Sequence, residues 1–107
     1  MARPRIASDV FRAVADPTRR ELLDLLAGGD LNVMKMAESF QMSLPAISQH
    51  LKVLREAGLV RERSEGRMRL YTLVPGPLEE IADWVGEYET FWQTRLGKLG
   101  EHLRKTK

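Results

Sequence analysis

Apolar residues recur every three or four positions in the first half of the chain, which is the spacing of one face of an α-helix. The first such stretch covers residues 5–15. The second begins at Asp16-Pro17, where aspartate can cap free backbone amides and proline at the first helical position loses no hydrogen bond. It stops at Gly28-Gly29, because glycine readily adopts the left-handed conformation that ends helices. The pattern predicts two helices at the start of the chain.

Two further helices follow, joined by a tight connection. Asn32 can cap a short helix with the sequence VMKMAESF, and Ser43 can cap a longer one that Gly58 ends. Only Gln41, Met42 and Ser43 separate the two, so together they predict a helix-turn-helix. The longer helix places three apolar residues toward the core, namely Ile47, Leu51 and Leu54.

The periodicity changes after this helix. Residues 60–73 alternate in character on both sides of a turn at Glu65-Gly66, which predicts a β-hairpin, the only clear one in the sequence. The tripeptide PGP at 75–77 then breaks the structure. Pro77 begins a long last helix, whose apolar spacing continues to Leu103.

The order of these elements is helix, helix, helix-turn-helix, hairpin, helix. It predicts a mainly α fold with a β-hairpin wing (α+β), that is, a winged helix-turn-helix. A chain of 107 residues with 43% hydrophobic content is long enough for one compact core and too short for two. We therefore expect a single domain over residues 1–107, with a long C-terminal helix used for dimerisation.

In the first turns of the second helix of the helix-turn-helix, the outward side chains are short, polar and nearly free of charge. In this fold the N-terminal residues of that helix meet base edges in the major groove of DNA. Serine and glutamine can exchange hydrogen bonds with bases, whereas proline and alanine offer apolar contact to a thymine methyl group. The candidate DNA-contacting residues here are Ser43, Pro45, Ala46, Ser48, Gln49 and Lys52.

Charge is distributed unevenly along a chain whose formal net charge is only +2. Residues 43–73 carry six bases against three glutamates, whereas residues 78–94 carry five acids and no base. A basic segment around a candidate recognition helix is the electrostatic pattern of a nucleic-acid contact. Arg67 follows the glycine of the hairpin turn, where a long cation can reach a phosphate. The hairpin candidates for DNA contact are Arg63, Arg67 and Arg69.

A winged helix that docks protein instead of DNA is the alternative from another functional class. A protein-docking wing has little need of four arginines within nine residues, Arg61, Arg63, Arg67 and Arg69. The arginines therefore favour double-stranded DNA as the partner.

The last predicted helix carries one broad apolar stripe, and a small domain has little core left to cover it. The alternative is that the stripe packs within its own chain, as part of it is expected to do. We expect a two-fold homodimer joined by this helix and the first one. The candidate interface residues are Phe11, Val14, Ile81, Trp84, Val85, Tyr88, Trp92 and Leu99.

Three segments, DPTRRELLDLL, MAESFQMSLPAISQHLKVLREAGLV and EGRMRLYTL, resemble the ArsR/SmtB family of bacterial winged-helix transcriptional repressors over roughly residues 9–74. The resemblance implies a homodimer that binds a palindromic operator and represses transcription, often of its own operon. A cytoplasmic location is expected separately, from the composition of the chain. It also implies a recognition helix at Leu44–Ala57, a wing at Val60–Leu73 and a dimer interface formed by the terminal helices.

The chain departs from this family's metal-sensing members, which carry two cysteines just before the recognition helix. It has no cysteine, and Asn32 and Met34 stand at those positions. The two histidines, His50 and His102, lie far apart, so we expect no metal site and no cofactor. Two alternatives stay open: a metal-responsive repressor with a non-cysteine site built from His102 and acids, and a soft Cu(I) site formed by Met34, Met36 and Met42. Methionine filling gaps around a short helix is the simpler interpretation.

Enzymatic activity is not expected. The sequence contains no glycine-rich phosphate loop, no nucleophile with a matching base and no paired histidines. No apolar run approaches membrane-spanning length, and the N-terminus lacks the apolar core of a signal peptide. The effector, if the protein responds to one, cannot be read from the residues.

Overall fold

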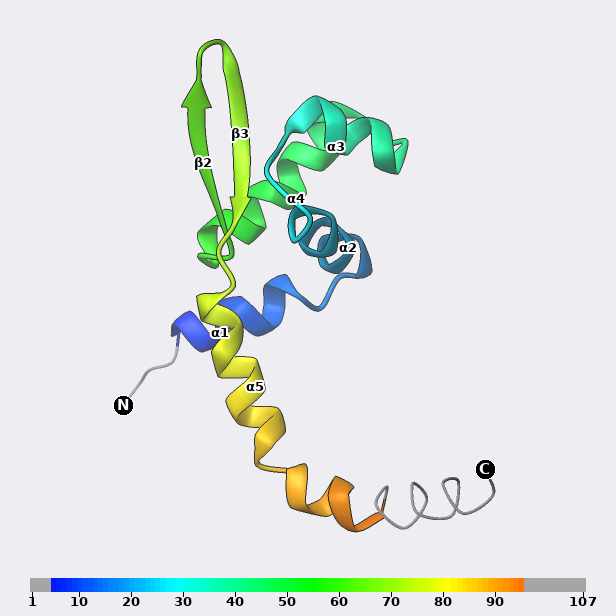
Figure 1. Ribbon diagram of the computed structural model, residues 1–107, viewed down its shortest axis with the longest axis vertical. Helices are drawn as coiled ribbons and strands as arrows, with labels where there is room; N and C mark the ends of the chain where they lie inside the picture. Colours follow the sequence, from blue (N-terminus) through cyan, green and yellow to red (C-terminus); the bar gives the residue numbers. More distant parts are fainter. Residues whose placement is uncertain (1–4, 96–107) are drawn as a thin grey trace.

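The computed structural model describes residues 5–95 (Figure 1). It has three parts: a helical body, a small sheet, and a helical arm formed by residues 79–95. The predicted element order is confirmed, including the mainly helical fold with a hairpin wing. The elements are α1 (Arg5–Ala13), α2 (Pro17–Leu26), β1 (Leu31–Asn32), α3 (Val33–Phe40), α4 (Leu44–Glu56), β2 (Val60–Glu65), β3 (Met68–Leu73), the 3₁₀ turn η1 (Gly76–Leu78) and α5 (Glu79–Gly86).

The three predicted helix caps are confirmed. The Asp16 carboxylate accepts a hydrogen bond from the Arg19 amide at 3.0 Å, the Asn32 side chain accepts from the Lys35 amide at 2.8 Å, and the Ser43 hydroxyl accepts from the Ala46 amide at 3.2 Å. Each bond satisfies one of the backbone donors that a helix start leaves without an intrahelical partner. These caps fix where α2, α3 and α4 begin.

The core lies where α1, α2, α3 and α4 meet the base of the wing. The apolar face predicted for the second helix of the helix-turn-helix is buried, and no polar or charged residue of the described part is buried with it. The largest fully buried side chains are Val10, Leu22, Met36, Ile47, Leu51, Leu54 and Leu59.

The sheet has one strand more than the sequence predicted. The hairpin β2–β3 is antiparallel from Val60↔Leu73 to Glu65↔Met68, as expected, and β1 pairs with β3 on the other side, giving the order β1-β3-β2. A strand of two residues cannot show the alternation by which longer strands are found. It nevertheless ties the start of α3 to the wing.

The expectation of one continuous last helix is wrong. The backbone amides of Glu87 and Tyr88 bond three residues back, to Trp84 and Val85, and helical structure resumes at residues 89–95 (Figure 1). Gly86 is the last residue of α5, and glycine is among the weakest helix formers, so its position explains the break. The predicted helical residues Leu99 and Leu103 lie outside the described part of the chain. Within residues 5–95, no helix is long and apolar enough to cross a membrane.

Candidate nucleic-acid interface

The helix α4 has one buried and one open face, which separates its structural from its candidate contact residues. Ile47, Leu51 and Leu54 are fully buried. On the outer side Ser43, Pro45, Ser48, Gln49 and Lys52 are exposed, and Ala46 is half-buried. The six candidates on this helix and its N-cap therefore lie within its first three turns, and none of them is fully buried in the core.

Arg19 holds α4 in place through a network that sequence reasoning missed. Its guanidinium donates to the carbonyl oxygens of Ala13 at 2.7 Å and Arg12 at 3.1 Å, and it lies 3.4 Å from Nδ1 of His50 on α4. Both carbonyls belong to the last turn of α1. This helix ends at Ala13, two residues earlier than the predicted range of 5–15. No local pattern marks this role of Arg19, because Ala13 lies six residues away and His50 lies 31 residues away in the sequence.

The ring of His50 therefore lies beside Arg19 and belongs to no cluster of potential metal-binding side chains among the described residues. Among residues 5–95 no three histidine, cysteine, aspartate or glutamate side chains converge on one point. His102 lies outside the described residues. The three methionines differ in burial: Met36 is fully buried, Met42 packs against the core, and Met34 is 67% exposed. The gap-filling role is therefore confirmed for Met36 and Met42 and wrong for Met34, because the start of α3 turns that side chain outward.

The wing presents a two-residue loop at its tip, Gly66-Arg67, between the paired residues Glu65 and Met68. Gly66 has φ +64°, a conformation that glycine adopts without the strain that a Cβ atom brings. Arg67 is exposed beside it. The hairpin (Figure 1) thus carries a cation at its tip, where Arg67 lines a hollow together with Val33 and Met34 at the start of α3.

Two of the three arginines predicted on the wing are engaged with carboxylates. Arg63 donates to Asp30 at 2.6 Å and to the Thr72 hydroxyl at 3.2 Å, which ties β2 across β3 to the residue before β1. Arg69 donates to Glu62 at 2.5 Å. Within the described residues, Arg67 and Lys52 form no ion pair.

The Asp30–Arg63 contact changes the acidity of its carboxyl group. The hydrogen bond from Arg63 is the main cause that holds the pKa of Asp30 below its usual 3.8, and the bond from Thr72 acts in the same direction. The hydrogen bond from the Arg19 amide lowers the pKa of Asp16 in the same way, as expected for a helix cap. Both carboxylates are thus charged when the protein is folded near neutral pH.

The predicted dimer face is partly assembled within the chain. The rings of Phe11 and Trp84 meet edge to face with centroids 5.5 Å apart, and Tyr88 stands 5.9 Å from Trp84. Val14 and Ile81 pack against the core, and Val85 is half-buried. Trp84 is still 50% exposed and Trp92 44% exposed, so much of the aromatic surface is left uncovered. The eighth predicted residue, Leu99, lies outside the described part of the chain.

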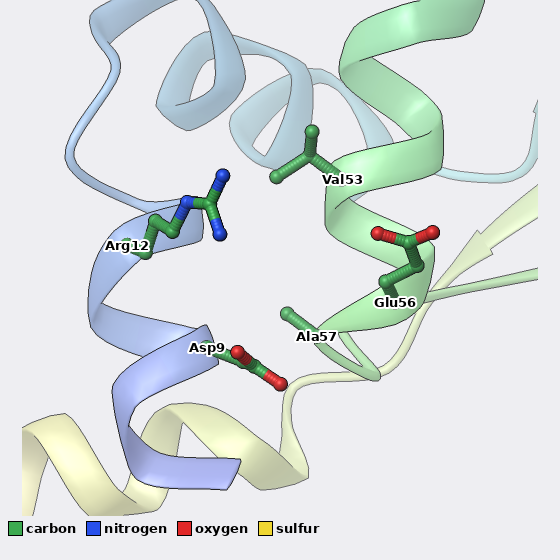
Figure 2. Close-up of a pocket in the computed structure, with 5 residues that line it drawn as sticks. All are labelled: Asp9, Arg12, Val53, Glu56 and Ala57. Atoms are coloured by element: carbon green, nitrogen blue, oxygen red, sulfur yellow. The ribbon is translucent and has the colours of Figure 1, made fainter. Parts of the chain in front are cut away.

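A small hollow of about 80 Å³ lies between α1 and the end of α4 (Figure 2). Asp9 and Arg12 line it from α1, whereas Val53, Glu56 and Ala57 line it from α4 and its C-terminal cap. It contains both signs of charge and is much smaller than the pockets that hold drug-sized ligands. The hollow therefore marks the junction of α1 and α4.

Comparison with known proteins agrees with the arrangement of helix-turn-helix and wing. Residues 16–62 match the family described as "Bacterial regulatory protein, arsR family". The transcriptional repressor SdpR of Bacillus subtilis is 40% identical over 78 residues, which are 73% of this chain and 87% of the relative. The HTH-type transcriptional regulator Rv2034 of Mycobacterium tuberculosis is 38% identical over 96 residues, 90% of this chain and 87% of the relative.

Solved structures give the same result. An ArsR family transcriptional regulator superposes with a TM-score of 0.74 and 33% identity, covering 87% of this chain and 97% of that one. A homodimeric winged helix-turn-helix DNA-binding domain from Mycobacterium bovis, a possible ArsR-family regulator, superposes with a TM-score of 0.65 and 29% identity, covering 81% and 82%. The sequence match and the structural match both span the helix-turn-helix, so the chain belongs to the arsR family of bacterial regulatory proteins.

Proposed function

We propose that the protein is a homodimeric transcriptional repressor that binds a palindromic double-stranded operator. The observation that carries the proposal is the open face of α4, where exposed Ser48, Gln49 and Lys52 follow a capped, uncharged first turn and stand beside a basic hairpin. Short polar side chains allow a helix to approach base edges closely, and nearby cations bind the flanking phosphates. The relatives named as repressors support the direction of regulation.

In this proposal the candidate residues have different tasks. Ser48 and Gln49 hydrogen-bond to bases, Pro45 and Ala46 make apolar contacts, and Ser43 caps the helix at the DNA surface. Lys52 and Arg67 contact phosphates. The carboxylate partners of Arg63 and Arg69 support a primary role for these two arginines in holding the wing.

A second copy of the chain supplies the second recognition helix. The uncovered Trp84, Tyr88 and Trp92 support an interface built from α1 and the segment after η1, and the homodimeric neighbour from Mycobacterium bovis supports two-fold assembly. Two recognition helices related by a two-fold axis address half-sites about one helical turn (roughly 34 Å) apart, or a multiple of this spacing. The operator is therefore a palindrome.

Selection from a pool of random DNA duplexes tests the proposal. The wild-type protein should enrich a palindrome, and Gln49→Ala should enrich a site altered at one position in each half. Gln93→Ala removes the same side chain from an exposed position in the last helical segment and should enrich the wild-type site. A protein that enriches no sequence and binds no duplex at micromolar concentration would contradict the proposal and favour a protein partner.

A further inference from the structure

Glu62 bridges the recognition helix to both strands of the wing. One carboxylate oxygen lies 2.7 Å from Nη1 of Arg55, in the last turn of α4, and the other lies 2.5 Å from Nη1 of Arg69 on β3. The Glu62 side chain is only 19% exposed, whereas that of Arg69 is 70% exposed. The carboxylate is therefore the sheltered centre of a three-residue bridge whose two cations lie nearer to solvent.

The register of the hairpin explains why the bridge forms. Glu62 is directly opposite Tyr71, which is buried, so Glu62 lies on the face of the hairpin that turns toward the helical body. Arg69 pairs with Ser64 and is the diagonal neighbour of Glu62 on that same face, within reach of a long side chain. A shift of one residue in the pairing would move Glu62 to the opposite face.

The bridge lies at the point where apolar support for the wing ends. Leu59 and Val60 are buried and anchor the base of the hairpin, whereas residues 63–69 are exposed along its outer part. Glu62 is between these two regions and provides an ion-pair link from α4 to the wing. The link from Arg63 to Asp30 joins the hairpin to a different segment, the residue before β1.

We propose that Glu62 is a positioning residue that sets the angle between the recognition helix and the wing, and so determines sequence selectivity without touching DNA. The inference rests on the proposed function. An acidic group close to a DNA-binding surface repels phosphate, so by its charge alone Glu62 lowers the affinity for any duplex. By its ion pairs, Glu62 also has a second effect: it holds α4 and the wing at the angle at which both contact one half-site, which raises the affinity for the operator.

The Glu62→Gln variant separates the positioning effect from the charge effect, because the two predict opposite changes in affinity for the operator and for unrelated DNA. Affinity for an unrelated duplex should rise two- to threefold, because the loss of the carboxylate leaves Arg55 and Arg69 available to phosphates. Affinity for the palindrome selected by the wild type should fall about tenfold, because the wing is no longer fixed relative to α4. The ratio of the two affinities is the readout, measured at several salt concentrations on full-length protein.

Glu65→Gln is the matched control, because it makes the same chemical change on the same strand. Glu65 is near the tip and its nearest described cation is Arg63 at 3.9 Å, so it joins neither α4 nor Arg69. Its replacement should raise both affinities equally and keep their ratio. If Glu62→Gln behaves like Glu65→Gln, Glu62 is only a negative charge and the inference is overturned.

Arg55→Gln tests the bridge from the helix side and covers the case in which Glu62→Gln folds poorly. It should lower the affinity ratio to a similar extent, and the double variant Arg55→Gln/Glu62→Gln should lower it no further than either single change. Additive losses would overturn the bridge. A wild type that selects no palindrome would overturn the proposed function itself, and this inference with it.

Discussion

Arg63 and Arg67 lie four residues apart on the wing, yet their surroundings predict different contributions to DNA binding. Arg67 is exposed at the tip with no carboxylate partner among the described residues, whereas Arg63 is bound to Asp30. Arg67→Ala should weaken binding to all duplexes several-fold and reduce the slope of log affinity against log salt by about one unit, because one phosphate contact is lost.

Arg63→Ala is the control for this measurement, since it also removes one arginine from the wing. Titration of each variant at four or more salt concentrations gives the slopes. Arg63→Ala should keep a slope close to that of the wild type. Equal slopes for Arg67→Ala and the wild type would contradict a phosphate contact by Arg67 at the tip of the wing.

Asp30 makes stability depend on pH on the acid side. Its pKa is lower in the folded protein than the usual 3.8, chiefly because Arg63 donates a hydrogen bond to it. The folded state therefore binds this proton less readily than the unfolded state, so the stabilisation is complete above about pH 5 and is lost as the pH falls through the folded pKa. In urea unfolding, the difference between wild type and Asp30→Asn should shrink steadily below about pH 4.

Asp24→Asn, which removes an exposed carboxylate of α2, controls for the loss of one negative charge. A wild type and an Asp30→Asn variant that differ by the same amount at pH 3 and pH 7 would show that the Asp30–Arg63 contact does not contribute in solution.

At the scale of the elements, Gly58 joins the recognition helix to the wing with φ +80°. A Cβ atom at this position would lie 3.6 Å from Cγ of Pro77, an ordinary contact, so the cost of Gly58→Ala comes from the backbone conformation. We expect the free energy of unfolding to fall by about 1–2 kcal/mol. Gly76→Ala adds the same methyl group in open space at an ordinary φ and should change stability by less than about 0.5 kcal/mol.

Local chemistry explains which elements the sequence could predict. Caps and turn glycines act over three or four residues, so Asp16, Asn32, Ser43 and Gly66 were recognisable from their neighbours alone. The strand β1 is too short for a periodic pattern and forms only because β3 lies beside it. The break after Gly86 was hidden because the apolar spacing continues on both sides of it.

The candidate site was predictable to a similar degree. The open face of α4 follows directly from helical periodicity, so its residues could be named before the structure. The partners of the wing arginines could not, because the pairs Arg63–Asp30 and Arg69–Glu62 depend on sheet register and on the approach of the segment before β1. The sequence therefore predicted which arginines lie on the wing, but not that carboxylates pair with Arg63 and Arg69.

At the scale of the whole molecule, the chain is extended. Its radius of gyration is 17.8 Å, whereas a compact domain of about 100 residues measures roughly 13 Å, and α5 leads away from the body (Figure 1). The exposed aromatic residues of this arm form the surface that the proposed dimer buries. Trp92→Glu should shift the protein toward monomer in sedimentation at micromolar concentration and weaken palindrome binding by tenfold or more.

Met34→Glu makes a comparable change at another exposed apolar residue, on α3 and away from the arm. It should leave the sedimentation coefficient unchanged. A wild-type protein that sediments as a monomer and still binds the palindrome tightly would contradict the dimer.

Metal ions should not alter DNA binding. Tight Zn²⁺ sites need several converging nitrogen, sulfur or oxygen ligands, and the described residues bring no such group together. Palindrome affinity should be the same with a chelator and with excess Zn²⁺ or Ni²⁺. A tenfold loss with stoichiometric metal that His102→Ala abolishes would instead reveal a site involving that histidine.

The uncovered arm also makes the amount of protein a regulatory input. On the proposed dimer, a second copy of the chain covers Trp84, Tyr88 and Trp92, which are exposed among the described residues, so assembly follows mass action. Below the dimer dissociation constant, the concentration of dimer varies with the square of the chain concentration, and halving the supply lowers it about fourfold. Synthesis rate and dilution by cell growth would then set a threshold for operator occupancy, without any small molecule.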